Sequence, residues 1–375
     1  MRKYQNDCEV GLLKKTLKIF GKIVLILLVA VLVAAVGLFG WLTVTEYKPA
    51  DTESVSVAMP AFSSRSPAVQ TAAKDTPLSV LTMNIGYGAL GKDSDFFMDG
   101  GKQTRPNSSD VITADLAGIE KIISDHPADF VLLQEVDTDS DRCYGINEKE
   151  QLISATGMTS AFALNYSCGF VPFPLPPIGK VHSGLLTLSR CTVTSADRVS
   201  LPCPFSWPVR TANLKRCLLV SRIPVEGSDS ELVLINLHLE AYDDGEGKIA
   251  QTELLLSLLE TEYTKGNYVI AGGDFNQVFP QTELRYPNEH PDLWAPGVLE
   301  QDALPAQWQY AFDPETPTCR LLNQPYDPAD TLNTQYYVID GFIVSPNITV
   351  TAVQTLDEGF TYSDHNPVLL SFILK

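Results

Sequence analysis

Apolar residues follow two different patterns along the chain. Residues 23–44 form one uninterrupted run without a charged residue, IVLILLVAVLVAAVGLFGWLTV. About 20 residues of α-helix cross the hydrocarbon layer of a bilayer, so this run is long enough to span it. A cleaved signal peptide is the alternative, but its apolar region is normally only about 7–15 residues long. We therefore expect an uncleaved transmembrane anchor at residues 23–44.

From residue 78 onward, the apolar residues instead come in short runs separated by turn-forming residues. Runs such as LSVLTMN, FVLLQEVD, ELVLINLH and YVIAGGD are typical of buried strands. Helical spacing of apolar residues appears in DLAGIEKIISD and in IAQTELLLSLLETEY. Many strands and few helices predict a layered α/β domain with two packed sheets and helices outside them.

Two further stretches lack both patterns. Residues 45–77 are rich in Ser, Ala, Thr, Pro and Asp, and we interpret them as a linker. Residues 157–180 are rich in aromatic residues and proline, and we expect an extended loop there. That loop either packs on the domain surface or forms an apolar lip that contacts lipid or a substrate tail. The predicted organisation is a basic tail at 1–22, the anchor at 23–44, the linker at 45–77 and a folded domain at 78–375.

Charge is distributed unevenly along this organisation. The net charge is −18, yet residues 1–22 hold six basic and two acidic residues, so the rest of the chain carries −22. A basic flank stays in the cytoplasm, which predicts a single-pass protein of the cell membrane with its domain outside. An acidic domain repels nucleic acid at long range, although bound divalent cations offset this locally. The seven cysteines include no CxxC pair, so zinc is not indicated, while both disulfides and free buried thiols remain open.

Polar residues stand at the ends of the predicted strands. They are Asn84, Glu135, His238, Asp274, Asn276, Asp340, Asp364 and His365. Each alone fits a turn or a solvated position. If the strands end at one edge, however, several carboxylates meet, and they repel one another unless a cation lies among them. Carboxylate and carboxamide oxygens suit Mg²⁺, Mn²⁺ or Ca²⁺, and two nearby histidines predict metal-assisted hydrolysis of a phosphoester.

The order of these motifs resembles that of a known family. MNIGYG, LLQEVD, GLLTLSR, INLHLEA, GGDFN, IDGFIVS and SDHNPV occur in this sequence in the order of the signature blocks of the endonuclease/exonuclease/phosphatase superfamily. That DNase I-like superfamily includes abasic-site endonucleases, neutral sphingomyelinases and inositol polyphosphate phosphatases. The resemblance covers about residues 78–375, and the segment HSGLLTLSR resembles the neutral sphingomyelinase branch. It implies a four-layered α/β/β/α sandwich and Mg²⁺-dependent (or Mn²⁺-dependent) cleavage of phosphoesters.

The resemblance also implies roles for individual residues. Glu135 corresponds to the principal metal ligand, assisted by Asn84 and by Asp364, which binds directly or through water. The catalytic group is expected to comprise five residues, His238, Asp274, Asn276, Asp340 and His365. Of these, Asp274 orients or deprotonates water or holds a second metal, and Asn276 hydrogen-bonds the phosphate. His238 contacts the scissile phosphate and protonates the leaving group. His365 is the base or stabilises the transition state, and Asp340 fixes its tautomer.

Other polar residues leave more alternatives open. Arg142 and Tyr144 either meet a substrate phosphate or lie in a surface loop, and His182 is expected to be structural. Three functions follow from the sequence. The first is a monomeric, membrane-tethered phosphodiesterase or phosphatase, with a lipid headgroup as one possible substrate. The second is an extracytoplasmic nuclease, which the acidic domain and the absence of a Lys/Arg track disfavour. The third is a non-catalytic binding domain that retains the fold.

Overall fold

The computed structural model describes residues 2–59, 71–330 and 332–375, and the chain divides into two compact units. The first unit, Met1–Glu46, consists of one long helix, α1 (Arg2–Val44). Within α1, Leu13–Val44 has a mean hydropathy of 3.1, and no part of its most apolar stretch is buried. By length and composition α1 is able to cross a membrane, and a signal sequence near the N-terminus has the same properties.

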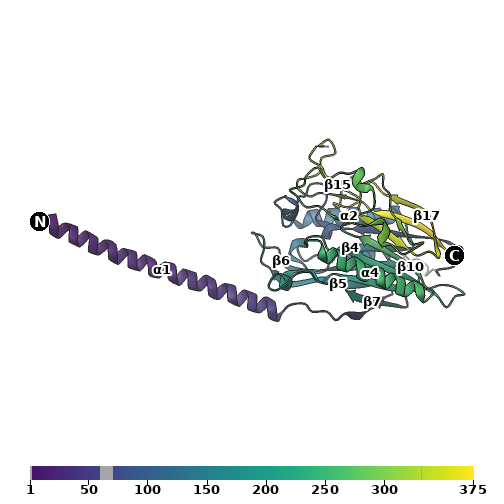
Figure 1. The fold of residues 1–375 in the computed structure, drawn as a ribbon, viewed down its shortest axis with the longest axis horizontal. Coiled ribbons are helices and arrows are strands. Elements are labelled where there is room, and N and C mark those ends of the chain that lie inside the picture. Colours follow the sequence, from purple (N-terminus) through teal and green to yellow (C-terminus); the bar gives the residue numbers. More distant parts are fainter. Residues whose placement is uncertain (1, 60–70, 331) are drawn as a thin grey trace. The chain divides into compact units, whose positions relative to one another are not determined.

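Two seven-stranded sheets form the second unit, Tyr47–Lys375 (Figure 1). The first sheet contains, in spatial order, β1 (Thr52–Val55), β7 (Ser195–Ser200), β8 (Cys217–Pro224), β9 (Glu231–His238), β10 (Tyr268–Asp274), β16 (Asp340–Val344) and β13 (Gln309–Ala311). The second contains β17 (Ile348–Thr355), β18 (Val368–Leu374), β3 (Pro77–Asn84), β4 (Phe130–Asp137), β6 (Gly179–Ser189), β5 (Thr159–Val171) and β2 (Val57–Ala58). Two short ladders pair β11 (Gln277–Val278) with β12 (Gly297–Val298), and β14 (Cys319–Arg320) with β15 (Tyr336–Tyr337).

Three apolar clusters show that these sheets and helices form four layers. The cluster between the sheets joins residues such as Leu132 of β4 and Ile270 of β10. A second cluster packs α4 (Glu246–Thr264) on the outer face of the first sheet, and a third packs α2 (Ser109–Asp125) and α3 (Glu148–Thr156) on the outer face of the second. This arrangement confirms the predicted α/β/β/α sandwich. Its strands read as nearly continuous apolar runs because both faces of each sheet are covered.

The two helices predicted from apolar spacing are present. The segment DLAGIEKIISD lies in α2, whose Leu116, Ile119 and Ile122 are buried against the second sheet. Pro127 follows the end of α2, as expected for a residue that disfavours continuation of a helix. The segment IAQTELLLSLLETEY lies in α4, and Leu255 and Leu259 face the first sheet. Burying each such side chain contributes about 1.5–3 kcal/mol.

Two segments differ from their predictions. The extended loop predicted at 157–180 is wrong, because most of it forms the hairpin strands β5 and β6, and only residues 172–178 connect them. The alternating burial of β5 explains the difference: Ala161 and Ala163 face the core between less buried neighbours. Within the predicted linker 45–77, β1 pairs with β7 and β2 pairs with β5. Residues 60–70 of that linker lie outside the described part of the chain.

Candidate active site

Strand register brings three of the predicted site residues side by side. Strand β10 lies between β9, which is parallel to it, and β16, which is antiparallel. Asp274, the last residue of β10, is the register partner of His238 on one side and of Asp340 on the other. All three side chains are buried. Neighbouring strands of a sheet lie only about 5 Å apart, so this register alone places two carboxylates and one imidazole in one cluster.

A side-chain amide joins this cluster to the second sheet. Nδ2 of Asn84, at the end of β3, donates to Oδ2 of Asp274 at 3.1 Å and to Oε1 of Glu135 at 3.2 Å. The Asn84 Oδ1 atom accepts a hydrogen bond from the backbone N–H of Gly86 at 3.0 Å. In this arrangement Asn84 bridges two carboxylates, and its oxygen is already engaged. Its predicted role as a cation ligand therefore stays a prediction.

Glu135 points into the cluster because the backbone of β4 is distorted there. The pairing of β4 with β6 shifts register between Leu133 and Val136, and Glu135 itself has φ 56°. A bulge redirects a side chain that would otherwise continue the alternation of the strand. The left-handed conformation is unfavourable for a residue with a Cβ atom, so the surrounding sheet must hold it. Oε1 of Glu135 lies 3.9 Å from Nε2 of His238.

The segment that opens the last strand carries Asp364 and His365. Backbone pairing with β14 fixes it, because the N–H of Arg320 donates to the carbonyl oxygen of Asp364 at 3.0 Å. The Ser363 hydroxyl also donates to the carbonyl oxygen of Asn84 at 2.8 Å. Asp364 and His365 are consequently held beside the end of β3.

His365 is paired with Asp340 as the motifs predicted. Nδ1 of His365 lies 2.8 Å from Oδ2 of Asp340, and Nε2 lies 3.8 Å from Oδ2 of Asp274 and 3.9 Å from Oδ2 of Asp364. Burial alone would lower the pKa of His365, but the Asp340 and Asp364 carboxylates outweigh it and hold this pKa well above its ordinary value. These two carboxylates therefore favour the protonated form of the imidazole.

His238 has the opposite electrostatic character. Its Nε2 atom lies 3.4 Å from Oδ2 of Asp274, and its buried Nδ1 atom has no hydrogen-bond partner within the described residues. Burial lowers the pKa of His238 well below its ordinary value, and the nearby Arg216 guanidinium adds to the effect. Asp274 thus lies between one imidazole whose pKa is lowered and one whose pKa is raised.

Two carboxyl groups of the cluster have raised pKa values. Burial, with the Asp340 carboxylate adding to it, raises the pKa of Asp274 to about 6. Burial also raises the pKa of Asp364 to about 6, with Glu135 adding to the rise and His365 opposing it. Oδ1 of Asp340 is buried without a hydrogen-bond donor among the residues that the structure describes. Crowded, poorly neutralised carboxylate oxygens of this kind fit a hard divalent cation.

Two overlapping sets of possible ligands have all their ligand atoms within 4.8 Å of one another among the described residues. One set is Asp274, Asp340 and His365, and the other is Cys319, Asp364 and His365. Glu135, which the family resemblance suggested as the principal ligand, belongs to neither set. Whichever set is used, a cation here would lie among the same strand ends.

Arg142 and Tyr144 are placed differently from the rest of the predicted site. Nε and Nη2 of Arg142 each donate to the Asp137 carboxylate at 2.9 Å, and the guanidinium covers the ring of Tyr87 at 3.7 Å from its centroid. The Tyr144 hydroxyl donates to the carbonyl oxygen of Pro106 at 2.7 Å. Both groups are engaged within the protein, and their contact with a substrate stays a prediction.

The family motifs did not point to Glu148, a buried acid beside Asp137. Oε2 of Glu148, in the first turn of α3, accepts a hydrogen bond from the N–H of Asp137 at 2.8 Å, and its Oε1 has no donor within the described residues. Burial and the adjacent Asp137 carboxylate raise the pKa of Glu148 well above its ordinary value. No local sequence pattern separates Glu148 from a solvated glutamate at the start of a helix.

His182 lies outside the carboxylate–histidine cluster. Its Nδ1 atom lies 3.3 Å from the Thr138 hydroxyl, and its backbone N–H donates to Ser140. Its expected structural role stays a prediction. The acidic turn before α4, in which Asp243 accepts hydrogen bonds from the backbone and pairs with Lys248, also lies outside the cluster.

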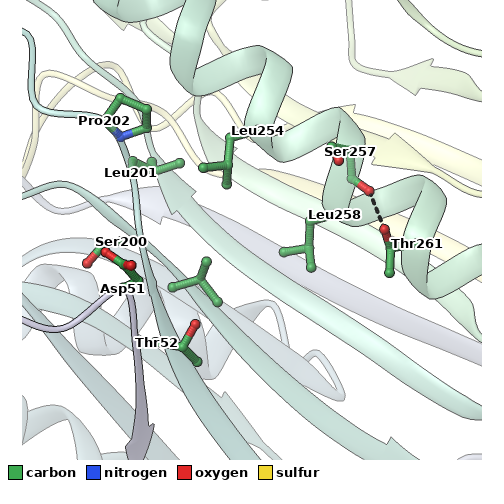
Figure 2. A pocket seen from close by; sticks show the side chains of 10 residues that line it. Asp51, Thr52, Ser200, Leu201, Pro202, Leu254, Ser257, Leu258 and Thr261 are labelled. Carbon is green, nitrogen blue, oxygen red and sulfur yellow. Dashed lines mark hydrogen bonds between the residues drawn. The ribbon is translucent and has the colours of Figure 1, made fainter.

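A shallow groove of about 560 Å³ lies elsewhere on the domain (Figure 2). Figure 2 shows side chains of α4 facing the segment after β7 and the start of β1 across this groove. Its lining consists of Asp51, Thr52, Val199, Ser200, Leu201, Pro202, Leu254, Ser257, Leu258 and Thr261. No residue of the carboxylate–histidine cluster lines it, so the groove is separate from the candidate active site.

Comparisons with known proteins agree with this architecture. In a search of solved structures, the endonuclease/exonuclease/phosphatase of Beutenbergia cavernae DSM 12333 is 18% identical, with 80% of this chain and 72% of that chain covered and a TM-score of 0.53. The endonuclease/exonuclease/phosphatase of Bacteroides vulgatus is 16% identical over 80% of this chain and 100% of that chain, with a TM-score of 0.51. ANGEL2, described as a 2′,3′-cyclic phosphatase, is 17% identical over 80% and 96%, with a TM-score of 0.51. At these identities the likeness establishes the fold.

No curated protein matches the sequence. The model of the Endonuclease/Exonuclease/phosphatase family, however, matches residues 81–365, which span the entire set of strand-end residues from Asn84 to His365. The match to most of the chain, the four-layered sandwich and the convergence of the motif residues lead to one conclusion: the chain belongs to the endonuclease/exonuclease/phosphatase family.

Proposed function

We propose that this protein is a phosphodiesterase or phosphatase that hydrolyses a phosphoester by attack of water, with help from a divalent cation such as Mg²⁺ or Mn²⁺. Members of its family are phosphoester hydrolases, and the cluster at the strand ends has the groups that such a reaction needs. The observation that carries the proposal is the placement of Asp274 between His238 and His365, with its Oδ2 atom 3.4 and 3.8 Å from their Nε2 atoms.

Each residue of the cluster has a distinct part in this proposal. Asp274 is buried and has a raised pKa, so its carboxylate is suited to orient the attacking water and accept a proton from it. His365, held by Asp340, places a positive charge where negative charge develops on the phosphoryl oxygens. His238 is neutral and offers Nε2 to the phosphate or to the leaving oxygen.

The acidic side chains would also hold the cation. Glu135 and Asp364 supply the carboxylate oxygens proposed to bind it, and Asn84 bridges Glu135 and Asp274 by donating to both. When bound, the cation would neutralise charge on the phosphoryl group and polarise its bond to oxygen. The Asn276 side chain is engaged within the protein, because its Nδ2 donates to the carbonyl oxygen of Leu239, and its backbone has φ 49°.

We further propose that α1 is a single-pass anchor and that the domain lies outside the cell. The basic residues before the apolar run and the uncharged length of the run support this orientation. An anchored, acidic domain is better suited to a substrate in the membrane than to nucleic acid, so a phospholipid headgroup is the substrate class that we favour.

The decisive experiment is a substrate and cation panel on the detergent-solubilised full chain. Hydrolysis of bis-p-nitrophenyl phosphate is expected with Mg²⁺ or Mn²⁺ and should fall to background in excess chelator. Equal turnover in chelator would overturn the cation-assisted mechanism. A faster reaction on sphingomyelin or phosphatidylcholine vesicles than on plasmid DNA supports the lipid substrate, and the reverse result supports the nuclease alternative.

A histidine pair provides the matched control for the site. His365→Ala is expected to lower activity by about 10²–10⁴-fold, the usual contribution of a general acid–base or charged group. His182→Ala, which alters a histidine outside the cluster, should leave activity close to that of the unmodified chain. If His365→Ala retains activity while His182→Ala loses it, the assignment of the site is wrong. If neither chain cleaves any phosphoester, the non-catalytic binding domain becomes the better description.

A further inference from the structure

The hairpin connection between β5 and β6 exposes large apolar side chains. Residues 172–178 read PFPLPPI and contain no charged or polar side chain; we call them the tip loop. Phe173 is 68% exposed and Leu175 is 88% exposed. Such exposure in a water-soluble domain marks a contact surface more often than an accident of sequence. The Phe173 ring touches that of Phe97 at 5.9 Å between centroids, so the tip loop lies beside the 3₁₀ turn Phe97–Asp99.

A second exposed loop lies along the same hairpin. Residues 201–216, which connect β7 to β8 and which we call the basic loop, are joined to β5 by two hydrogen bonds. The N–H of Lys215 donates to the carbonyl oxygen of Asn165 at 2.7 Å, and the Tyr166 hydroxyl donates to the carbonyl oxygen of Ala212 at 2.9 Å. At its outer part, Trp207 is 55% exposed.

The charge of this loop is opposite to that of the chain. Residues 201–216 contain Arg210, Lys215 and Arg216 and no acidic residue, whereas the whole chain has a net charge of −18. Arg216 is buried and pairs with Glu240, so Arg210 and Lys215 carry the charge of the outer part of the loop. An exposed Trp and basic residues in one loop without acidic residues suit the interface of an anionic bilayer, where the ring lies among headgroups and the cations meet lipid phosphates.

The chain between α1 and the domain is short. Helix α1 ends at Val44, and three residues later Tyr47 is fixed to β5, because its hydroxyl donates to the carbonyl oxygen of Leu164 at 3.4 Å. The Arg198 guanidinium also lies over the Tyr47 ring. Only residues 45 and 46 therefore separate the proposed anchor from a residue that is fixed to β5.

We propose that the tip loop and the basic loop form a membrane-docking surface that contacts the lipids of the bilayer in which the chain is anchored. The inference rests on the proposed membrane anchor and extends it, because it assigns a second lipid contact to the catalytic domain itself. Phe173, Leu175 and Trp207 enter the headgroup region, and Arg210 and Lys215 meet anionic headgroups.

The docking surface adjoins the loop that leads out of the candidate active site. The N–H of Lys180, just after the tip loop, donates to Oδ2 of Asp141, and Nζ of Lys180 pairs with Asp139 at 2.7 Å. That loop follows β4, the strand that carries Glu135. Lys180 thus connects the tip loop to the loop that follows the strand of Glu135.

Photo-crosslinking of the full chain tests this surface without depending on activity. The chain, with p-benzoylphenylalanine in place of Phe173, Leu175 or Trp207, is reconstituted into vesicles of phosphatidylcholine and phosphatidylglycerol and irradiated. Lipid adducts are measured by mass spectrometry. Trp41, inside the apolar run, is the control for the anchor, and Leu284, which is 79% exposed on a different turn, is the matched exposed control.

We expect adducts at all three surface positions, at least tenfold above the level at Leu284. Adducts at Trp41 but only the Leu284 level at Phe173 and Leu175 would overturn the docking surface. Adducts with protein in place of lipid would overturn it equally, and would indicate a protein partner. Absence of lipid adducts at Trp41 counts against the anchor within the proposed function, and adducts at Phe173 in that case still support the surface.

A double variant separates docking from catalysis. Phe173→Ser combined with Leu175→Ser is expected to lower hydrolysis of vesicle lipid at least tenfold while leaving hydrolysis of soluble bis-p-nitrophenyl phosphate unchanged. Equal loss on both substrates would overturn the proposal, since the loop would then shape the active site and not the contact with lipid.

Discussion

The raised pKa of Asp274 makes a sharp prediction about Asp274→Asn in the metal-free protein. Asp274 is 1% exposed, and burial together with the Asp340 carboxylate raises its pKa to about 6 from an ordinary value near 3.8. A carboxyl whose pKa is raised by folding stabilises the fold while it is protonated. That contribution is complete below pH 3.8 and is lost as the pH rises through about 6.

The size of the effect follows from the difference between the two pKa values. One pKa unit corresponds to about 1.4 kcal/mol, so at pH 8 the ionised carboxylate lowers the free energy of unfolding by about 3 kcal/mol relative to a neutral group. Asparagine removes this charge, but it weakens the hydrogen bond from Asn84, a loss of about 1 kcal/mol. Asp274→Asn should therefore be about 2 kcal/mol more stable than the unmodified chain at pH 8 and about 1 kcal/mol less stable at pH 4.

Urea unfolding of the detergent-solubilised chain, followed by tryptophan fluorescence in excess chelator, measures both values. A saturating concentration of Mg²⁺ at pH 8 should reverse the order, because the cation stabilises only the form that binds it. His182→Ala serves as the comparison, since its effect should not change sign between the two pH values. If Asp274→Asn is destabilising by the same amount at pH 4 and pH 8, the cluster does not repel the charge of Asp274 and the electrostatic reasoning fails.

Three further predictions concern the His365–Asp340 pair, the packing of β10 and an exposed thiol. Asp340→Asn should lower turnover by about 10–100-fold, the value of one charge-assisted hydrogen bond. It should also shift the pKa of His365 down toward its ordinary value. An NMR titration that finds this pKa unchanged contradicts the pairing. Gly273→Ala should destabilise the domain by about 3 kcal/mol and abolish activity, because a Cβ atom would lie 2.0 Å from the carbonyl oxygen of Leu237. A variant that is active and as stable to urea as the unmodified chain would refute the packing. Cys203, the exposed thiol among the six described free cysteines, should account for the fast phase of thiol labelling of the domain, and Cys203→Ser should remove that phase.

Local sequence determined the elements of the domain and the identity of its chemical groups. Nearly continuous apolar runs marked β3, β4, β9 and β10, since strands covered on both faces consist mostly of apolar residues. The apolar run at 23–44 likewise determined the helix. Ordered motifs supplied Asp274, His365 and the residues that accompany them, because the chemistry requires those residue types at the strand ends.

Tertiary structure alone decided how those groups meet. The register that sets Asp274 between His238 and Asp340 depends on strands that are far apart in sequence, and so does the bulge that turns Glu135 into the cluster. The strands β1 and β2, within a segment of linker-like composition, likewise form only because β7 and β5 offer free edges to them. Hydrogen bonds between distant strands leave no periodicity in the segments that they join. For this reason the sequence identifies what can react, and the fold determines which groups face one another.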